Sequence, residues 1–342
     1  MLLQTQIKIR SGLHGWLLFL WVCVVGVLIP VLTPETAYGT PLEERLIREA
    51  PALNFYARPN SYAIENDSYD RLMVGVHVNG FGPFPFIIDT GASRSIIYRS
   101  LTAMMPLEAI PNKSRRVLTV NGYHSALVYP MKDIYALGST LSLPETVALP
   151  DIDGSDAKGL LGVDLLAGKT LVVRPAARTA SLLKNAASLN VAEWQYIQGR
   201  PVAYGSLALE VDFGGVHVPV IVDTGASDTV INSAGAKTLL RAATGIRTEK
   251  TIAVVARGKT IAREKLVLPH FDLAGKSFRN TPIYVADVPI FRLLGAADVP
   301  AIILGMNVIG QQDFAIDFKG WRLYMQIEKQ APSRPIIPSA GY

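Results

Sequence analysis

The sequence predicts an all-β protein made of two similar lobes with a cleft between them. One observation behind this prediction is an internal duplication: residues 89–93, Asp-Thr-Gly-Ala-Ser, recur unchanged at residues 223–227. The other is that short β-branched runs, punctuated by Gly, Pro and Asn, fill residues 71–327, as is typical of β-proteins. A self-similarity with a period of 134 residues indicates two copies of a domain-sized unit, far longer than a solenoid repeat.

The duplication extends on both sides of the shared pentapeptide. Nine residues before its aspartate, each copy has a turn glycine, Gly80 in the first and Gly214 in the second. Downstream, each copy has an apolar segment that ends in a glycine, at Gly162 and at Gly305. These paired features predict that the two copies share one topology.

Each copy also contains a candidate hairpin. Residues 117–128 and residues 251–264 each consist of two strand-like runs around a short turn signal. The predicted turn residues are Asn121 and Gly122 in the first hairpin, and Arg257 and Gly258 in the second.

These boundaries divide the chain into six parts. They are a signal peptide or membrane anchor (1–39), an N-terminal segment that is a pro-segment or a docking strand (40–70), a first lobe (71–183), a linker (184–201), a second lobe (202–328) and a loose tail (329–342).

The N-terminus has the pattern of an export signal. Lys8 and Arg10 precede an uncharged apolar run at residues 15–32, and small residues at 37–39 offer a cleavage site. The alternative is an uncleaved anchor, because the run is just long enough to span a bilayer. In either case the lobes are expected outside the cytoplasm, periplasmic or secreted, or anchored facing the periplasm.

Composition excludes several function classes. The chain has 342 residues and a net charge of +5, and its scattered Lys and Arg residues disfavour nucleic-acid binding. The single cysteine, Cys23, lies in the apolar run, so the exported part has no thiol nucleophile. The five histidines have no metal-ligand spacing, and the acidic loop at 151–156 lacks the glutamate of a calcium loop. We therefore expect no metal and no organic cofactor.

The duplicated loop carries the chemistry. An Asp-Thr-Gly sequence after a buried strand presents a carboxyl group on a sharp loop, and its glycine permits both backbone torsions and a close approach that a side chain would block. If the two loops meet back to back, their carboxyl groups share one proton, because both cannot easily be charged at short range. One then acts as a general base on water while the other donates a proton to a carbonyl oxygen.

Together, the loops, hairpins and apolar-Gly segments resemble those of two-lobed, single-chain aspartic proteases, close to the retropepsin-like aspartyl proteases of bacteria. The resemblance implies that Asp89 and Asp223 are the catalytic pair, and that Thr90 and Thr224 join the two loops. It implies that the segments at Gly162 and Gly305 support the loops, and that the hairpins are flaps over the substrate. The remaining loop residues are Gly91, Ala92, Ser93, Gly225, Ala226 and Ser227.

Three details refine this resemblance. Ala92 and Ala226 replace the Ser or Thr usual in pepsin-like enzymes, and the loss of that donor predicts a working pH from mildly acidic to near neutral. Tyr123, beside the first hairpin turn, resembles a flap tyrosine or is an ordinary strand residue. Arg94 and Asp228 follow the two loops, so the two halves of the cleft are expected to differ in charge preference.

The predicted function is that of an aspartic endopeptidase acting on extended peptide or protein substrates. The chain is expected to be a monomer that forms an internal pseudo-dimer. The alternative is an exported module with the same fold that binds extended peptides without cutting them.

Overall fold

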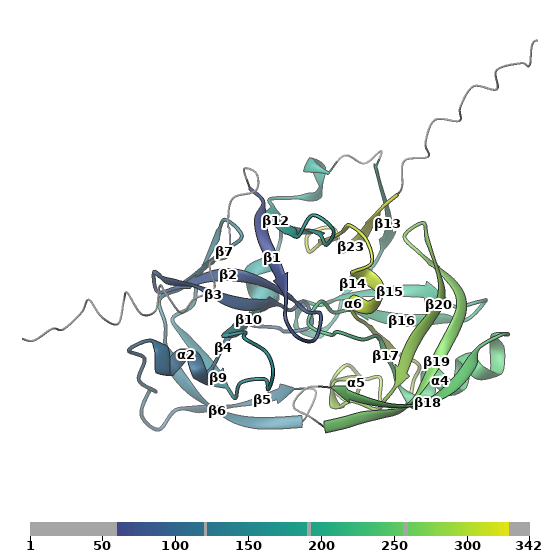
Figure 1. Cartoon of the computed structure of the whole chain (residues 1–342), viewed down its shortest axis with the longest axis horizontal. Coiled ribbons are helices and arrows are strands. Elements are labelled where there is room, and N and C mark those ends of the chain that lie inside the picture. The colour runs from purple at the N-terminus through teal and green to yellow at the C-terminus, as the bar shows by residue number, and fades with distance from the viewer. Residues whose placement is uncertain (1–59, 120–121, 190–192, 256–258, 328–342) are drawn as a thin grey trace, which may run out of the picture. The chain divides into compact units, whose positions relative to one another are not determined.

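The computed structural model describes residues 60–119, 122–189, 193–255 and 259–327 (Figure 1). The predicted signal peptide or anchor at 1–39, the start of the N-terminal segment at 40–59 and the tail at 329–342 lie outside these ranges, as do the predicted turn residues Asn121, Arg257 and Gly258. No helix within the described ranges is long and apolar enough to cross a membrane.

The prediction of an all-β fold is confirmed. Within the described residues, strands form one sheet of 15 and one of eight. The larger sheet contains β1 (Tyr62–Asn66), β2 (Leu72–Val78), β3 (Phe81–Ile88), β4 (Ile96–Tyr98), β5 (Ser114–Thr119), β6 (Gly122–Pro130), β7 (Asp133–Ala136), β8 (Ser139–Ser142), β9 (Glu145–Leu149), β10 (Gly159–Leu161), β11 (Thr170–Arg174), β12 (Thr179–Leu183), β13 (Trp194–Gln198), β22 (Phe314–Asp317) and β23 (Arg322–Gln326).

The smaller sheet belongs to the second lobe. Its strands are β14 (Arg200–Pro201), β15 (Leu207–Asp212), β16 (His217–Val222), β17 (Val230–Ile231), β18 (Arg247–Val255), β19 (Lys259–Leu273), β20 (Lys276–Val285) and β21 (Ile302–Leu304). The helices are short: α2 (Arg99–Met104), α3 (Val163–Leu166), α4 (Ser233–Ala242), α5 (Pro289–Leu293), α6 (Met306–Ile309) and the 3-10 turns η1 (Ala186–Ser188) and η3 (Ala203–Gly205).

The two lobes repeat one strand order. In the first lobe it is β2-β3-β10-β4-β9-β6-β5, and in the second it is β15-β16-β21-β17-β20-β19-β18. Pairing sense is also repeated: β10 runs parallel to β3, as β21 does to β16, and β4 runs parallel to β9, as β17 does to β20. The sequence duplication is therefore a duplication of topology.

Turn chemistry sets the start of each lobe. Asn79 and Gly80 join β2 to β3 with φ angles of 52° and 85°, a left-handed pair that matches the twist of a tight hairpin. In the second lobe Gly214 and Gly215 have φ angles of 73° and 90° between β15 and β16. Both strands that follow, β3 and β16, end at the residue before an Asp-Thr-Gly loop.

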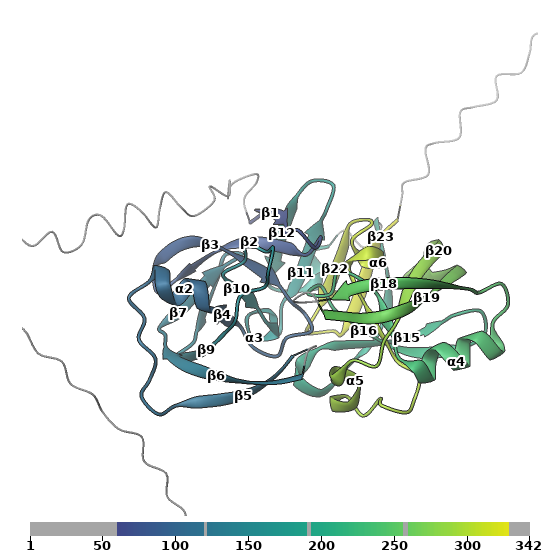
Figure 2. The same cartoon turned by 60° about the horizontal axis from the view of Figure 1, so that its bottom comes forward.

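Strands from both repeats also combine in the larger sheet. The order β13-β23-β22-β11-β12-β1 joins β11 of the first repeat to β22 of the second (Figure 2). The described end of the N-terminal segment contributes β1, which pairs with β12 and β2. A single buried core contains residues of both lobes.

The predicted linker is more structured than the sequence indicated. It contains η1, β14 and β13, and β13 pairs with β23 along its whole length. Trp194 of β13 is buried in a small apolar cluster with Val172 and Tyr324. The interpretation as a linker was wrong for this strand because its partner lies far along the chain and leaves no local pattern.

Candidate active site

Each Asp-Thr-Gly loop begins where a buried strand ends. The backbone N–H of Asp89 donates to the carbonyl oxygen of Leu161 (2.9 Å), and that of Asp223 donates to Leu304 (3.0 Å). Leu161 and Leu304 are the last residues of β10 and β21, the strands of the two apolar-Gly segments. Each segment thus fixes the start of the loop beside it.

Four hydrogen bonds join the two loops through their threonines. Thr90 Oγ1 donates to the Val222 carbonyl oxygen (2.9 Å) and accepts from the Thr224 N–H (3.0 Å). Thr224 Oγ1 donates to the Ile88 carbonyl oxygen (2.6 Å) and accepts from the Thr90 N–H (3.2 Å). Both threonines are buried, so each of these groups depends on its partner in the other lobe.

We expect Thr90→Val to destabilise the fold by about 1–3 kcal/mol for each group it leaves unpaired. The groups are the Val222 carbonyl oxygen and the Thr224 N–H, and valine offers neither a donor nor an acceptor. Chemical denaturation measures the loss. Thr90→Ser keeps the hydroxyl and should recover most of it, whereas equal losses in both variants would contradict the hydrogen-bond account.

The carboxyl groups of the two loops lie against each other's glycines. A Cβ atom built on Gly91 would lie 2.6 Å from Asp223 Cγ, and one built on Gly225 would lie 2.4 Å from Asp89 Cγ. Neither glycine has a left-handed φ. They are therefore required for close approach, and the backbone freedom expected from the sequence is not what selects them.

Amide groups of its own loop hold each carboxyl group. Asp89 Oδ1 accepts from the N–H groups of Gly91 (2.9 Å) and Ala92 (2.8 Å), and Asp223 Oδ1 accepts from Gly225 (2.8 Å). Both aspartates remain partly exposed. They are buried enough for orientation and open enough for a substrate to reach them.

Burial raises the pKa of both aspartates above the usual carboxyl value, and the charge of Asp223 raises the pKa of Asp89 further. The loop amides favour the charged forms and oppose this rise only in part. Two close carboxyl groups with raised pKa values hold one proton between them over a range that extends upward from the ordinary carboxyl pKa. This is the ionisation state that acid–base chemistry on a water molecule requires.

The raised pKa values also set a pH dependence of stability. A carboxyl group whose pKa is higher in the folded chain than in the unfolded chain stabilises the fold below its ordinary pKa. That stability is lost as the pH rises through the folded pKa, because deprotonation then leaves an uncompensated charge.

We therefore expect Asp89→Asn to unfold at a higher temperature than the wild type at neutral pH, with a gain of about 1–3 kcal/mol. The gain should disappear near the ordinary carboxyl pKa, where the wild-type pair is protonated. Thermal unfolding across this pH range measures it, with Glu210→Gln, an exposed carboxylate on β15, as the control. A gain that does not change with pH would contradict the account.

A second layer of polar contacts supports each loop, and the side chains that form it were not singled out from the sequence. In the first lobe Asp164 accepts from the Ser95 N–H (2.9 Å) and from Ser95 Oγ (2.7 Å), and Ser95 Oγ accepts from the Gly162 N–H (3.0 Å). Gly162 is required there because a Cβ atom would lie 2.4 Å from the Arg94 backbone.

The second lobe repeats this arrangement. Asn307 Oδ1 accepts from the Thr229 N–H (2.9 Å) and Thr229 Oγ1 (2.7 Å), and Thr229 Oγ1 accepts from the Gly305 N–H (3.1 Å). A sequence signal for these residues existed. Ser95 and Thr229 each lie six positions after an aspartate, and each partner lies two positions after its glycine.

The equivalence of the two lobes makes Asp164→Asn a mild change. Because Asn307 performs the same role with an amide oxygen, the variant is expected to lose less than about 1 kcal/mol, whereas Asp164→Ala should lose about 1–3 kcal/mol. Urea unfolding of both variants gives the comparison. Similar losses in the two would show that the charge, and not the acceptor, is what Ser95 requires.

A cleft of about 1410 Å³ contains both aspartates and is lined by both lobes. Ser93 and Ser227, beside the aspartates, also line it. On the second-lobe side its wall includes Ile290 and Leu293 of α5, and α5 contacts β5 of the first-lobe hairpin (Figure 2). The sequence offered no indication of this contact, because α5 is one turn long.

The first-lobe hairpin lines this cleft. Tyr123 lines the cleft, 58% exposed, with the Arg116 guanidinium 4.0 Å from its ring centroid. Gly122, expected in the turn, is instead the first residue of β6 and pairs with Thr119. The paired part of the hairpin is therefore longer toward its tip than the Asn-Gly signal indicated. In the second lobe β18 and β19 form the corresponding hairpin, and Val255 pairs with Lys259.

The histidines near the loops are strand residues. His77 lies on β2, the strand before the one that ends at the first loop. His217 lies on β16, which ends at the second loop. In the described ranges no group of three or more His, Cys, Asp or Glu side chains could hold a metal ion.

Comparison with known protein families gives a paired result. A family model described as aspartyl protease matches residues 74–165 and again residues 209–308. Each match contains one Asp-Thr-Gly loop and one apolar-Gly segment, and together they span more than half of the chain. No curated protein sequence matches the chain.

Proposed function

Because the chain belongs to the aspartyl protease family, we propose that it is an aspartic endopeptidase that hydrolyses peptide bonds of extended polypeptides. The observation that carries the proposal is the meeting of the two loops, where the Asp89 carboxyl group packs on Gly225 and the Asp223 carboxyl group packs on Gly91. A binding module needs no such pair, since burying two carboxyl groups against each other costs stability.

In the proposed reaction a water molecule lies between the two carboxyl groups. The charged carboxylate takes a proton from this water, and the protonated carboxyl group donates its proton to the oxygen of the scissile carbonyl. Attack of the water oxygen on the carbonyl carbon gives a tetrahedral intermediate. The carboxyl group that took the proton from water then donates it to the leaving nitrogen. The other carboxylate takes a proton back from a hydroxyl group of the intermediate as the C–N bond breaks, so the pair again holds one proton.

The cleft supports an extended substrate. It is lined by residues of both lobes and of the hairpin strand β5. Such a lining suits a peptide that is bound by its backbone and recognised by alternate side chains. Ser93 and Ser227 are proposed to contact that backbone, since each follows its aspartate by four positions and lines the cleft.

The proposed closer relationship is with retropepsin-like enzymes. Its support is that Ala92 and Ala226 occupy the fourth position of both loops and that each lobe has a hairpin in the same place of its strand order. Alanine donates no hydroxyl hydrogen bond to a charged aspartate, so the pair should work from mildly acidic to near-neutral pH.

We further propose that the lobes act outside the cytoplasm as a single chain. The basic residues before an apolar run at residues 15–32 support export, with or without removal of that run. Because one chain supplies both aspartates, no second copy is needed to complete the pair.

Cleavage of an unstructured peptide mixture by the full chain, from about pH 3 to about pH 8, tests this function. We expect turnover that a statine-type transition-state analogue abolishes, with its maximum above the strongly acidic range. Absence of turnover at every pH, with retained peptide binding, would favour the binding module instead.

A further inference from the structure

The two halves of the cleft differ in charge at equivalent positions. Arg94 and Asp228 each lie five residues after a loop aspartate, and both line the cleft. A symmetric pair of lobes therefore presents a cation on one side and an anion on the other. The two residues are equivalent in the fold, because Gly162 packs against the Arg94 backbone as Gly305 packs against the Asp228 backbone.

Asp228 is accompanied by a second carboxylate. Asp70, from the turn between β1 and β2, lines the same cleft. Burial, and then the negative charge of Asp70, raise the pKa of Asp228 above its usual value. Among the residues that the structure describes, neither carboxylate accepts a hydrogen bond or forms an ion pair. Asp228 is half-buried and Asp70 is exposed, so two like charges without a partner face the cleft, and a cation that joins them is attracted by both.

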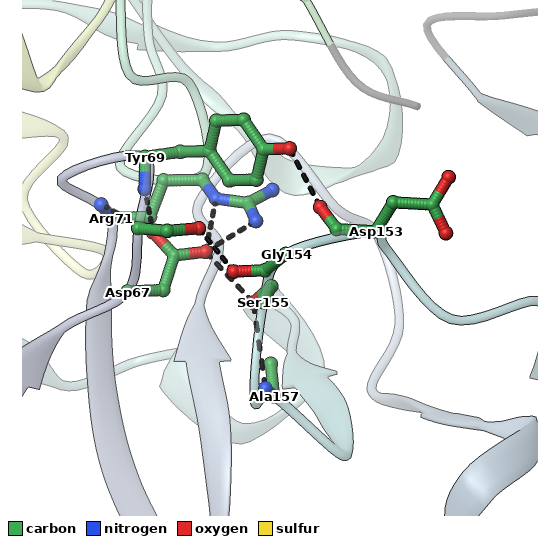
Figure 3. A network of polar contacts seen from close by, with 8 residues as sticks. Asp67, Tyr69, Arg71, Asp153, Gly154, Ser155 and Ala157 are labelled. Carbon is green, nitrogen blue, oxygen red and sulfur yellow. Dashed lines mark hydrogen bonds and ion pairs between the residues drawn. The ribbon is translucent and has the colours of Figure 1, made fainter. Parts of the chain in front are cut away.

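The turn that carries Asp70 is firmly held. Asp67 accepts hydrogen bonds from the backbone of Tyr69 and Arg71 (both 3.0 Å) and forms a buried ion pair with the Arg71 side chain (Figure 3). Ser155 Oγ donates to Asp67 Oδ2 (2.9 Å).

Two more contacts tie this turn to the loop at residues 153–157. The hydroxyl of Tyr69 donates to the Asp153 carbonyl oxygen (2.6 Å; Figure 3). The hydroxyl of Ser68 donates to the Gly154 carbonyl oxygen. The turn thus fixes the position of Asp70. Arg71, its neighbour in the chain, is committed to Asp67 and does not neutralise it.

We propose that Asp70 and Asp228 together form a subsite for a basic side chain, so that the cleft selects peptides with Lys or Arg at one position near the scissile bond. This inference rests on the proposed peptidase function. A cationic side chain gains two charge-assisted contacts there, a neutral side chain gains none, and an acidic side chain is repelled. Asp70 comes from the turn between β1 and β2 and Asp228 from the second lobe, so the subsite combines two distant segments of the chain.

The test uses statine-containing peptides in which one Lys, Gln or Glu is placed in turn at each position on either side of the statine. Equilibrium affinity for the full chain is measured, together with the kcat/KM of matching peptides that have an ordinary peptide bond. At one position, Lys should bind about tenfold or more tightly than Gln, and Glu more weakly than Gln. The same order is expected in kcat/KM.

Asp70→Asn and Asp228→Asn should each reduce the ratio of Lys to Gln affinity at that position severalfold, and the double variant should bring it close to one. Glu65→Gln on β1 and Glu210→Gln on β15 are the matched controls, since each removes an exposed carboxylate that does not line the cleft. These controls should keep the wild-type ratio. Asp228→Arg should reverse the preference in favour of Glu.

The outcomes separate this inference from the peptidase function. No preference for Lys at any position, or a preference that survives the double variant, would overturn the subsite even if every peptide is cut. A Lys preference in binding that depends on both carboxylates, without any turnover, would support the subsite and reject the peptidase.

Discussion

Asp89→Asn and Asp223→Asn are each expected to lower kcat/KM for a peptide substrate by roughly a thousandfold or more. Asparagine fits the space of aspartate and can accept the hydrogen bonds from the loop amides at Asp89 Oδ1 and Asp223 Oδ1. It cannot take a proton from water, and it cannot donate the proton that the carbonyl oxygen needs. The two exchanges should be nearly equal in effect, because the pair acts as one unit.

The measurement is kcat/KM on one defined peptide at the pH optimum of the wild type. Thermal unfolding of each variant at the same pH shows whether the fold is retained, and neither variant should be less stable than the wild type. A variant that keeps more than about a tenth of the wild-type activity would mean that its aspartate takes no part in proton transfer.

Gly225→Ala should also abolish activity, for a steric reason. The added methyl group would lie 2.4 Å from Asp89 Cγ, and Asp89 cannot withdraw because two loop amides hold it. The loops must separate or the carboxyl group must turn away, and a displacement of about 1 Å is enough to cost roughly a hundredfold in rate. Gly91→Ala, with its Cβ 2.6 Å from Asp223, should behave alike.

Peptide cleavage and binding of the statine analogue by these two variants check the prediction. Gly168→Ala is a matched control, because a Cβ atom at Gly168 meets nothing within 4 Å. Alanine at this φ of 70° costs stability, but Gly168 does not line the cleft that contains the aspartates. Full activity in Gly225→Ala would show that the two loops are not packed as closely as the account requires.

The loops could be predicted from the sequence because their signal is local and duplicated. An apolar strand followed by Asp-Thr-Gly specifies a carboxyl group at the end of a sheet, and two copies indicate that these ends meet. Gly162 and Gly305 were found by their matched positions, and their supporting role was implied by the resemblance to aspartic proteases. The same duplication could have indicated Ser95 and Thr229. Their hydroxyl oxygens accept equivalent hydrogen bonds from the N–H groups of Gly162 and Gly305.

Other parts of the site depend on contacts between distant segments. The pairing of β13 with β23, the approach of α5 to β5, and the presence of Asp70 and Asp228 in one cleft have no local sequence pattern. The reason for Gly91 and Gly225 was also only partly predictable. An Asp-Thr-Gly turn suggests a special backbone angle, whereas the structure shows a steric requirement imposed by the opposite lobe.

The central claim is that one carboxyl group from each repeat of the same chain forms one peptidase site. Titration of peptide cleavage with a tightly binding statine peptide, at protein concentrations well above its dissociation constant, tests this most directly. The account predicts that turnover falls linearly to zero at one statine peptide per chain. Loss of turnover at one per two chains, or turnover that the statine peptide does not affect, would contradict it.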